Sequence, residues 1–127
     1  MFIIDEETGD IITRQGDTWT IQVSGIDDSW DVYFSVYKGD TRERLFEIDT
    51  KPVNGVTTFN ITATHSNLMT VPIGKRTAVY YYGIKRCKVI GETSVEDTVI
   101  IGNKNVGDLN KLTVYPLITE GVENGAS

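Results

Sequence analysis

The sequence predicts an all-β fold, an antiparallel β-sandwich of about seven to nine strands with one short helical turn. Short apolar-rich runs follow one another along the 127 residues, and Gly, Asn, Asp or Pro separates most of them. Several runs alternate between apolar and polar side chains, which is the pattern of a half-buried strand. No run has the length or the period of a domain-sized helix, and no fixed repeat indicates a solenoid or a propeller.

The chain length of 127 residues is typical of a single domain. Residues 1–10 are acidic, and we expect them to form an amino-terminal arm or a short strand followed by a turn. The apolar runs place the β-sandwich domain at residues 11–117. Residues 118–127 are mostly small and polar, so we expect a flexible carboxyl-terminal tail there.

Two runs in the first third of the chain show the clearest strand pattern. In residues 18–24 every second side chain is apolar, namely Trp19, Ile21 and Val23. Residues 30–38 alternate in the same way, and their apolar row is Val32, Phe34 and Val36. A register shift of one residue would expose both rows, so the rows predict which face of each strand is buried.

The middle of the chain is expected to hold two strands and a tight turn. A strand over residues 44–49 would turn Phe46 and Ile48 inward, and Asn54-Gly55 is the strongest two-residue hairpin signal in the chain. The next inward row is Phe59, Ile61 and Ala63. The alternation then stops, and residues 64–69 are expected to form a capped helical turn across one end of the sandwich.

The longest strand candidate covers residues 77–88, and its length indicates a central position in a sheet. Its inward row is Tyr80, Tyr82 and Ile84. After a turn at Gly91, residues 94–101 are expected to return as a strand, and residues 102–108 to form a loop. Residues 112–115 are expected to close the domain as an edge strand that ends at Pro116.

The composition argues against several classes of function. The formal net charge is −6 and the basic residues are scattered, so nucleic acid is not expected as a partner. No apolar run is long enough to span a bilayer, so membrane insertion is not expected either. The single cysteine, Cys87, cannot form an internal disulfide.

No constellation of residues commits the chain to a reaction. A Cys87–His65 pair is the one nucleophile and base that the sequence offers, but a small strand residue and a loop histidine are the commoner explanation. Asp27, Asp28 and Asp31 surround a turn and could bind calcium, although hydrogen bonding within the turn is the favoured interpretation. We therefore expect no enzymatic activity, and assign no catalytic residue, metal or cofactor.

The tyrosines are more informative than the charged residues. In Tyr80-Tyr81-Tyr82, the middle ring must lie on the face opposite its neighbours, and Tyr33 and Tyr37 lie opposite the apolar row of their own strand. Tyr33, Tyr37 and Tyr81 are therefore candidates for a protein interface or for a platform on which a sugar stacks. The alternative is that they cover a sheet face as good strand formers.

Four short segments occur in an order that is typical of one family. They are Arg-Gln-Gly-Asp-Thr-Trp at residues 14–19, Asp-Val-Tyr-Phe-Ser-Val-Tyr-Lys at residues 31–38, Phe-Asn-Ile-Thr at residues 59–62, and Pro-Ile-Gly at residues 72–74 running into residues 80–84. Over residues 11–115 the chain resembles the small immunoglobulin-like domain at the amino terminus of baseplate upper proteins from tailed phages of Gram-positive bacteria. The least generic part of this match is Gly16-Asp17-Thr18.

This resemblance implies an immunoglobulin-like sandwich and a non-enzymatic structural part of a phage or prophage virion, in the tail, the baseplate or a fibre attachment. It implies other tail or baseplate proteins as partners, with a homo-oligomer as a further option, and it carries over no active-site residues. The amino terminus lacks the basic and long apolar regions of a secretory signal, so we expect synthesis in the bacterial host cytoplasm. The alternative function is that of a carbohydrate-binding β-sandwich module.

Overall fold

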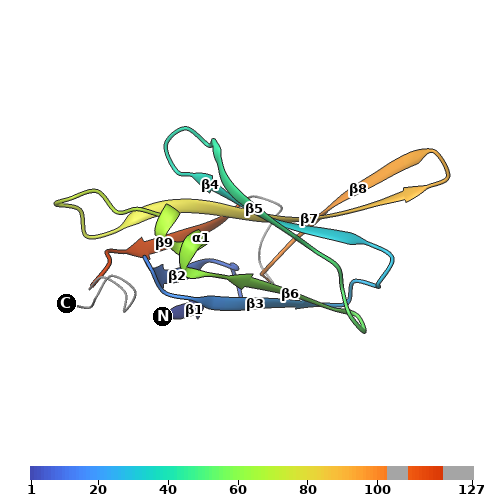
Figure 1. Cartoon of the computed structure of the whole chain (residues 1–127), viewed down its shortest axis with the longest axis horizontal. Coiled ribbons are helices and arrows are strands. Elements are labelled where there is room, and N and C mark those ends of the chain that lie inside the picture. Colours follow the sequence, from blue (N-terminus) through green and yellow to red (C-terminus); the bar gives the residue numbers. More distant parts are fainter. Residues whose placement is uncertain (103–108, 119–127) are drawn as a thin grey trace.

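Nine strands and one short helix make up the part of the chain that the structure, a computed structural model, describes: residues 1–102 and 109–118. The strands form a seven-stranded and a two-stranded sheet that pack as a sandwich (Figure 1), so the predicted fold class is confirmed. The expected loop at residues 103–108 and the tail at residues 119–127 lie outside the described residues. The elements are β1 (Phe2–Ile4), β2 (Ile11–Arg14), β3 (Trp19–Ser24), β4 (Asp31–Lys38), β5 (Arg44–Thr50), β6 (Val56–Ile61), α1 (Ala63–Leu68), β7 (Ala78–Ile90), β8 (Thr93–Val99) and β9 (Asn110–Tyr115).

The larger sheet has the strand order β1-β2-β9-β7-β4-β5, and β8 pairs with the second half of β7. As its length predicted, β7 is central and pairs with β4, β8 and β9. The predicted edge position of residues 112–115 is wrong, because β2 pairs with the other side of β9. This pair is parallel, and its two strands come from opposite ends of the chain. No tight turn connects them, so no turn signal in the sequence predicts the pairing.

The Asn54-Gly55 turn is present, but it does not connect paired strands. Both residues have a positive φ, 52° and 77°, as a two-residue type I′ turn requires. Val53 and Val56 exchange backbone hydrogen bonds of 2.8 and 3.1 Å across it. However, β5 pairs with β4 in the larger sheet, whereas β6 pairs with β3 in the smaller one. The turn therefore lies on the path of the chain from one sheet to the other.

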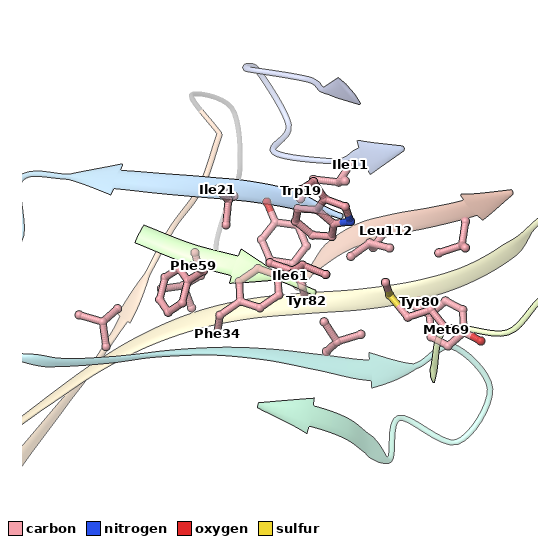
Figure 2. Close-up of a cluster of buried hydrophobic side chains, with 14 of the residues drawn as sticks. Ile11, Trp19, Ile21, Phe34, Phe59, Ile61, Met69, Tyr80, Tyr82 and Leu112 are labelled. Carbon is pink, nitrogen blue, oxygen red and sulfur yellow. The ribbon is translucent and has the colours of Figure 1, made fainter. Parts of the chain in front are cut away.

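The core lies between the two sheets (Figure 2). It contains most of the predicted rows together with Ile11, Met69 and Leu112, whereas Val23, Phe46 and Ile48 are only partly buried at its edge. Phe34 of β4 is fully buried, and its ring centroid lies 5.3 Å from Tyr82, 5.5 Å from Phe59 and 6.2 Å from Trp19. Because Trp19 and Phe59 belong to the smaller sheet, one aromatic side chain connects both layers. Ala63 departs from its predicted row, since it begins α1.

The predicted helical turn is confirmed as α1, which begins one residue earlier than expected and ends at Leu68. Thr62 caps it: its hydroxyl accepts from the His65 backbone N–H at 3.4 Å, and its own N–H donates to His65 Nδ1 at 3.3 Å. This reciprocal arrangement is a capping box. The buried Ser66 hydroxyl accepts from the Gly16 N–H at 2.9 Å, which ties the chain between β2 and β3 to the helix.

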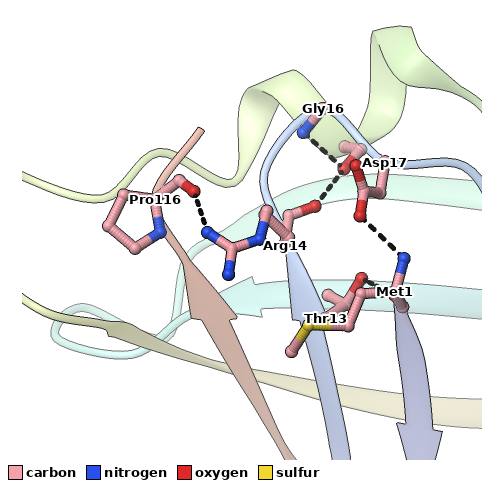
Figure 3. A network of polar contacts seen from close by, with 7 residues as sticks. Met1, Thr13, Arg14, Gly16, Asp17 and Pro116 are labelled. Atoms are coloured by element: carbon pink, nitrogen blue, oxygen red, sulfur yellow. Dashed lines mark hydrogen bonds and ion pairs between the residues drawn. The ribbon is translucent and has the colours of Figure 1, made fainter. Parts of the chain in front are cut away.

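Polar contacts also hold together the end of the larger sheet where β2 and β9 end (Figure 3). Arg14 Nη1 donates to the Pro116 carbonyl oxygen at 2.8 Å, and the Arg14 carbonyl oxygen accepts from the Ser66 hydroxyl at 3.3 Å. Gly16 has a φ of 89°, a value that favours glycine, and it begins the passage to the smaller sheet. Gly16 and Asp17 thus have a structural role here as a turn.

Candidate functional site

The three candidate tyrosines lie on the face of the larger sheet that points away from the smaller sheet. Tyr33 and Tyr37 alternate with the buried row of β4, and Tyr81 lies on β7 directly opposite Tyr37. Each of the three side chains is half-buried. The pairing register therefore brings them to one surface, although Tyr37 and Tyr81 are 44 positions apart in the sequence.

A groove of about 610 Å³ crosses this face and includes two of the three tyrosines. Tyr33 and Tyr37 line it, and between them the paired residues Ser35 and Gly83 lie along the floor. Tyr81 instead lines a separate depression of about 530 Å³. The Arg42 guanidinium covers the Tyr81 ring at 4.9 Å from its centroid. The structure thus groups Tyr33 with Tyr37 and separates Tyr81 from them.

Two ion pairs flank the groove. On the β5 side, Glu47 Oε2 accepts from Ser35 Oγ at 2.7 Å and from Arg44 Nη1 at 3.1 Å. On the β8 side, Lys85 Nζ lies 2.6 Å from Glu96 Oε1. The hydrogen bond from Lys85 and then its charge lower the pKa of Glu96, and the same contact raises the pKa of Lys85.

The hydroxyl of Tyr33 is held in its neutral form at this surface. The negative charge of Asp49 raises its pKa above the ordinary value of 10.0, and desolvation and Asp31 act in the same direction. A neutral tyrosine hydroxyl can donate and accept a hydrogen bond. The groove therefore combines two phenol rings, hydroxyl groups and paired charges.

Cys87 and His65 do not form a nucleophile and base pair. Cys87 lines the groove on the outer face, and its Sγ lies 3.9 Å from Glu96 Oε1. Burial, followed by the charge of Glu96, raises the pKa of the thiol and so disfavours the thiolate. The His65 ring stacks on Phe46 at 5.0 Å, and Phe46 pairs with the inward-facing Val36. The larger sheet therefore lies between the two side chains.

Of the three aspartates near residue 28, Asp27 makes the turn hydrogen bond that the sequence favoured, whereas Asp28 and Asp31 contact residues on a distant part of the chain. Asp27 Oδ1 accepts from the Ser29 backbone N–H at 2.9 Å and also from the Ser29 hydroxyl, and these bonds lower its pKa. Asp28 accepts from the Gly55 N–H at 3.1 Å, and Asp31 forms an ion pair with Lys51 at 2.9 Å. Within residues 1–102 and 109–118, no group of three or more Asp, Glu, His or Cys side chains is placed to hold a metal ion.

A second surface feature is a projecting two-stranded ribbon formed by residues 88–95; the sequence predicted its turn at Gly91 but not its projection beyond the sheet. The last pair between β4 and β7 is Asp31 with Cys87, so β7 and β8 continue beyond the sheet as a hairpin (Figure 1). Ile90 and Thr93 form its last pair, and Gly91 adopts a φ of 64° in the turn. The turn signal at Gly91 does not show where the hairpin leaves the sheet, and the apolar pair at residues 89–90 is equally compatible with a place in the core.

The tip of this ribbon exposes apolar side chains on both of its faces. Val89 is 72% exposed and Ile90 is 58% exposed, and successive strand residues point to opposite faces. Charged residues hold the base: Arg86 forms an ion pair with Asp97 at 2.8 Å, and Arg86 and Lys88 lie 4.4 and 4.2 Å from the Trp30 ring centroid. The ribbon is thus anchored at its base and apolar at its tip.

The helix content of the described residues is small, and no helix among them is both long enough and apolar enough to cross a bilayer. A scan against protein-family models and a search of curated proteins found no match for this chain.

Proposed function

We propose that this protein is a non-enzymatic structural component of a phage or prophage virion, located in the tail, the baseplate or a fibre attachment. It acts through contacts with other tail or baseplate proteins or with further copies of itself. The family resemblance of residues 11–115 motivates the proposal. The observation that carries it is the projecting ribbon with exposed Val89 and Ile90.

The ribbon offers both sources of affinity that strand-mediated assembly uses. Burying an exposed Val or Ile side chain at an interface contributes about 1.5–3 kcal/mol. Within the described residues β8 pairs with β7 alone, so its second edge presents backbone donors and acceptors to a partner strand. The anchored base keeps the ribbon in one orientation, which reduces the entropy lost on binding.

Mass spectrometry of purified phage particles from the source strain tests this proposal. We expect the wild-type chain in the particles and the double variant Val89→Asp/Ile90→Asp to be lost from them, because two carboxylates would be buried at the interface. Val53→Asp is the matched control, since Val53 is 68% exposed but lies on the Asn54-Gly55 turn. Absence of the wild-type chain from the particles, or equal incorporation of all variants, would contradict the proposal.

The second candidate function is that of a carbohydrate-binding module. The specific observation in its favour is the groove between Tyr33 and Tyr37, which differs in place and in chemistry from the ribbon tip.

A further inference from the structure

We infer that the outer-face groove of the larger sheet is a binding site for a neutral saccharide. The site comprises Tyr33 and Tyr37 as stacking groups, Glu47 and Glu96 as hydrogen-bond acceptors, and Ser35 with Gly83 as the floor. The inference rests on the second candidate function, whose ligand class and contacting groups it specifies, and it does not depend on the virion assignment.

The aromatic groups are spaced and exposed as a stacking site requires. Tyr33 and Tyr37 are four residues apart on one strand, which separates them by about 13 Å at the usual strand rise. Within the described part of the chain, no aromatic or cationic side chain stacks on either ring, whereas Arg42 covers Tyr81. Half-buried rings of this kind can pack against the apolar C–H face of a sugar while their hydroxyls remain hydrated.

The floor between the two rings is low because of its residues. Ser35 and the directly paired Gly83 are the smallest side chains on this part of the sheet, so the surface sinks between Tyr33 and Tyr37. Leu109 packs over Gly83, where an added Cβ would lie only 2.9 Å from Leu109 Cδ2. The Leu109 side chain thus forms an apolar wall beside Ser35, and a pyranose ring can contact it between the tyrosines.

The carboxylates supply acceptors at the two sides of the groove. Glu47 uses Oε2 for both Ser35 and Arg44, and Glu96 uses Oε1 for both Lys85 and Cys87. Among the described residues, no side-chain hydrogen bond uses the second oxygen of either carboxylate. These two oxygens can accept hydrogen bonds from sugar hydroxyls, and such bonds to a charged acceptor are the stronger kind.

The charge balance of the groove selects a neutral ligand. The two carboxylates are neutralised locally by Arg44 and Lys85, at 3.1 and 2.6 Å. An anionic ligand would compete with Glu47 and Glu96 for these cations, and a cationic ligand would compete with the cations for the carboxylates. A neutral polyol requires neither exchange. Its hydroxyls can form hydrogen bonds with the charged groups while both ion pairs stay intact.

Isotope-edited NMR titration of the full chain with a panel of neutral and anionic oligosaccharides tests this inference. We expect a neutral member to shift the amide signals of Ser35 and Gly83 at millimolar concentration. Tyr33→Ala and Tyr37→Ala should each weaken binding about tenfold, a loss typical of one aromatic contact. Glu47→Gln should weaken it as well, because the amide presents one acceptor in place of two.

Two variants serve as matched controls. Tyr115→Ala removes another half-buried tyrosine, on β9, and Glu43→Gln removes another carboxylate that is paired with a lysine, here Lys38 at 3.7 Å. Both should bind like the wild type, and the circular dichroism spectrum of each variant establishes that it is folded. A flat titration with every neutral saccharide, a response to anionic members alone, or equal losses in groove and control variants would overturn the inference.

Discussion

Tyr82 is a buried residue that contributes both to core packing and to hydrogen bonding. Its ring stacks on Phe34, and its hydroxyl donates to the Gly9 carbonyl oxygen at 2.5 Å. Gly9 itself has a φ of 79°, and an added Cβ would lie 2.4 Å from Asn110 Nδ2. The side chain of Asn110 donates to the carbonyl oxygens of Thr8 and Ile101 at 2.7 and 3.2 Å. A small buried network thus joins β7 and β9 to the turn before β2.

Burial of Tyr82 leads to a prediction about alkaline pH. Burial, with a smaller contribution from the charge of Asp10, raises its pKa well above the ordinary value of 10.0. The folded state therefore favours the neutral phenol, and this stabilisation is complete below pH 10.0 and is lost as the pH rises toward the folded-state pKa. Tyr82→Phe should cost about 1 kcal/mol at neutral pH but should flatten the decline at alkaline pH.

Urea unfolding at a series of pH values measures this effect. Tyr115→Phe is the control, because it removes a half-buried phenol hydroxyl elsewhere on the larger sheet. An alkaline decline that is equally steep in Tyr82→Phe and in the wild type would show that another group governs it.

At the scale of the element, the short helix depends on its cap. A six-residue helix has too few internal hydrogen bonds to be stable alone. Thr62 satisfies one of its free N–H groups, so Thr62→Ala should lower the free energy of unfolding by about 1 kcal/mol. Urea unfolding provides the value. Thr64→Ala, at an exposed position inside the helix, should leave the stability unchanged or slightly raised; equal losses in both variants would contradict the capping role.

The whole molecule should unfold as one unit, because Phe34 packs against both sheets. Phe34→Ala should lower the free energy of unfolding by about 3–5 kcal/mol. Tyr33→Ala, one residue earlier on the opposite face, should cost about 1 kcal/mol. Trp19 reports on the smaller sheet and Trp30 on the larger one near Arg86, so single-tryptophan variants can follow the two layers separately. Different urea midpoints for the two reporters would contradict a common core.

Much of the candidate surface followed from period-two patterns that a single strand contains. The rows of β4 and β7 predicted correctly that Tyr33, Tyr37 and Tyr81 each lie opposite the buried row of their own strand, because alternation alone decides which face a side chain takes. The grouping of Tyr33 with Tyr37 and the covering of Tyr81 by Arg42 were not predictable. The grouping depends on the cross-strand register, and the covering depends on the position of a loop residue. Neither can be recognised from the residues of one strand.

The sequence by itself determined the all-β class, the inward rows, the capped helix and the Asn54-Gly55 turn, because each depends on contacts between near neighbours in the chain. Only the tertiary structure decided the parallel pairing of β2 with β9, the assignment of β5 and β6 to different sheets, and the projection of the ribbon beyond β4. Those features arise from pairing between distant strands, where the free energy depends on which partners cover an edge and not on the residues of one strand.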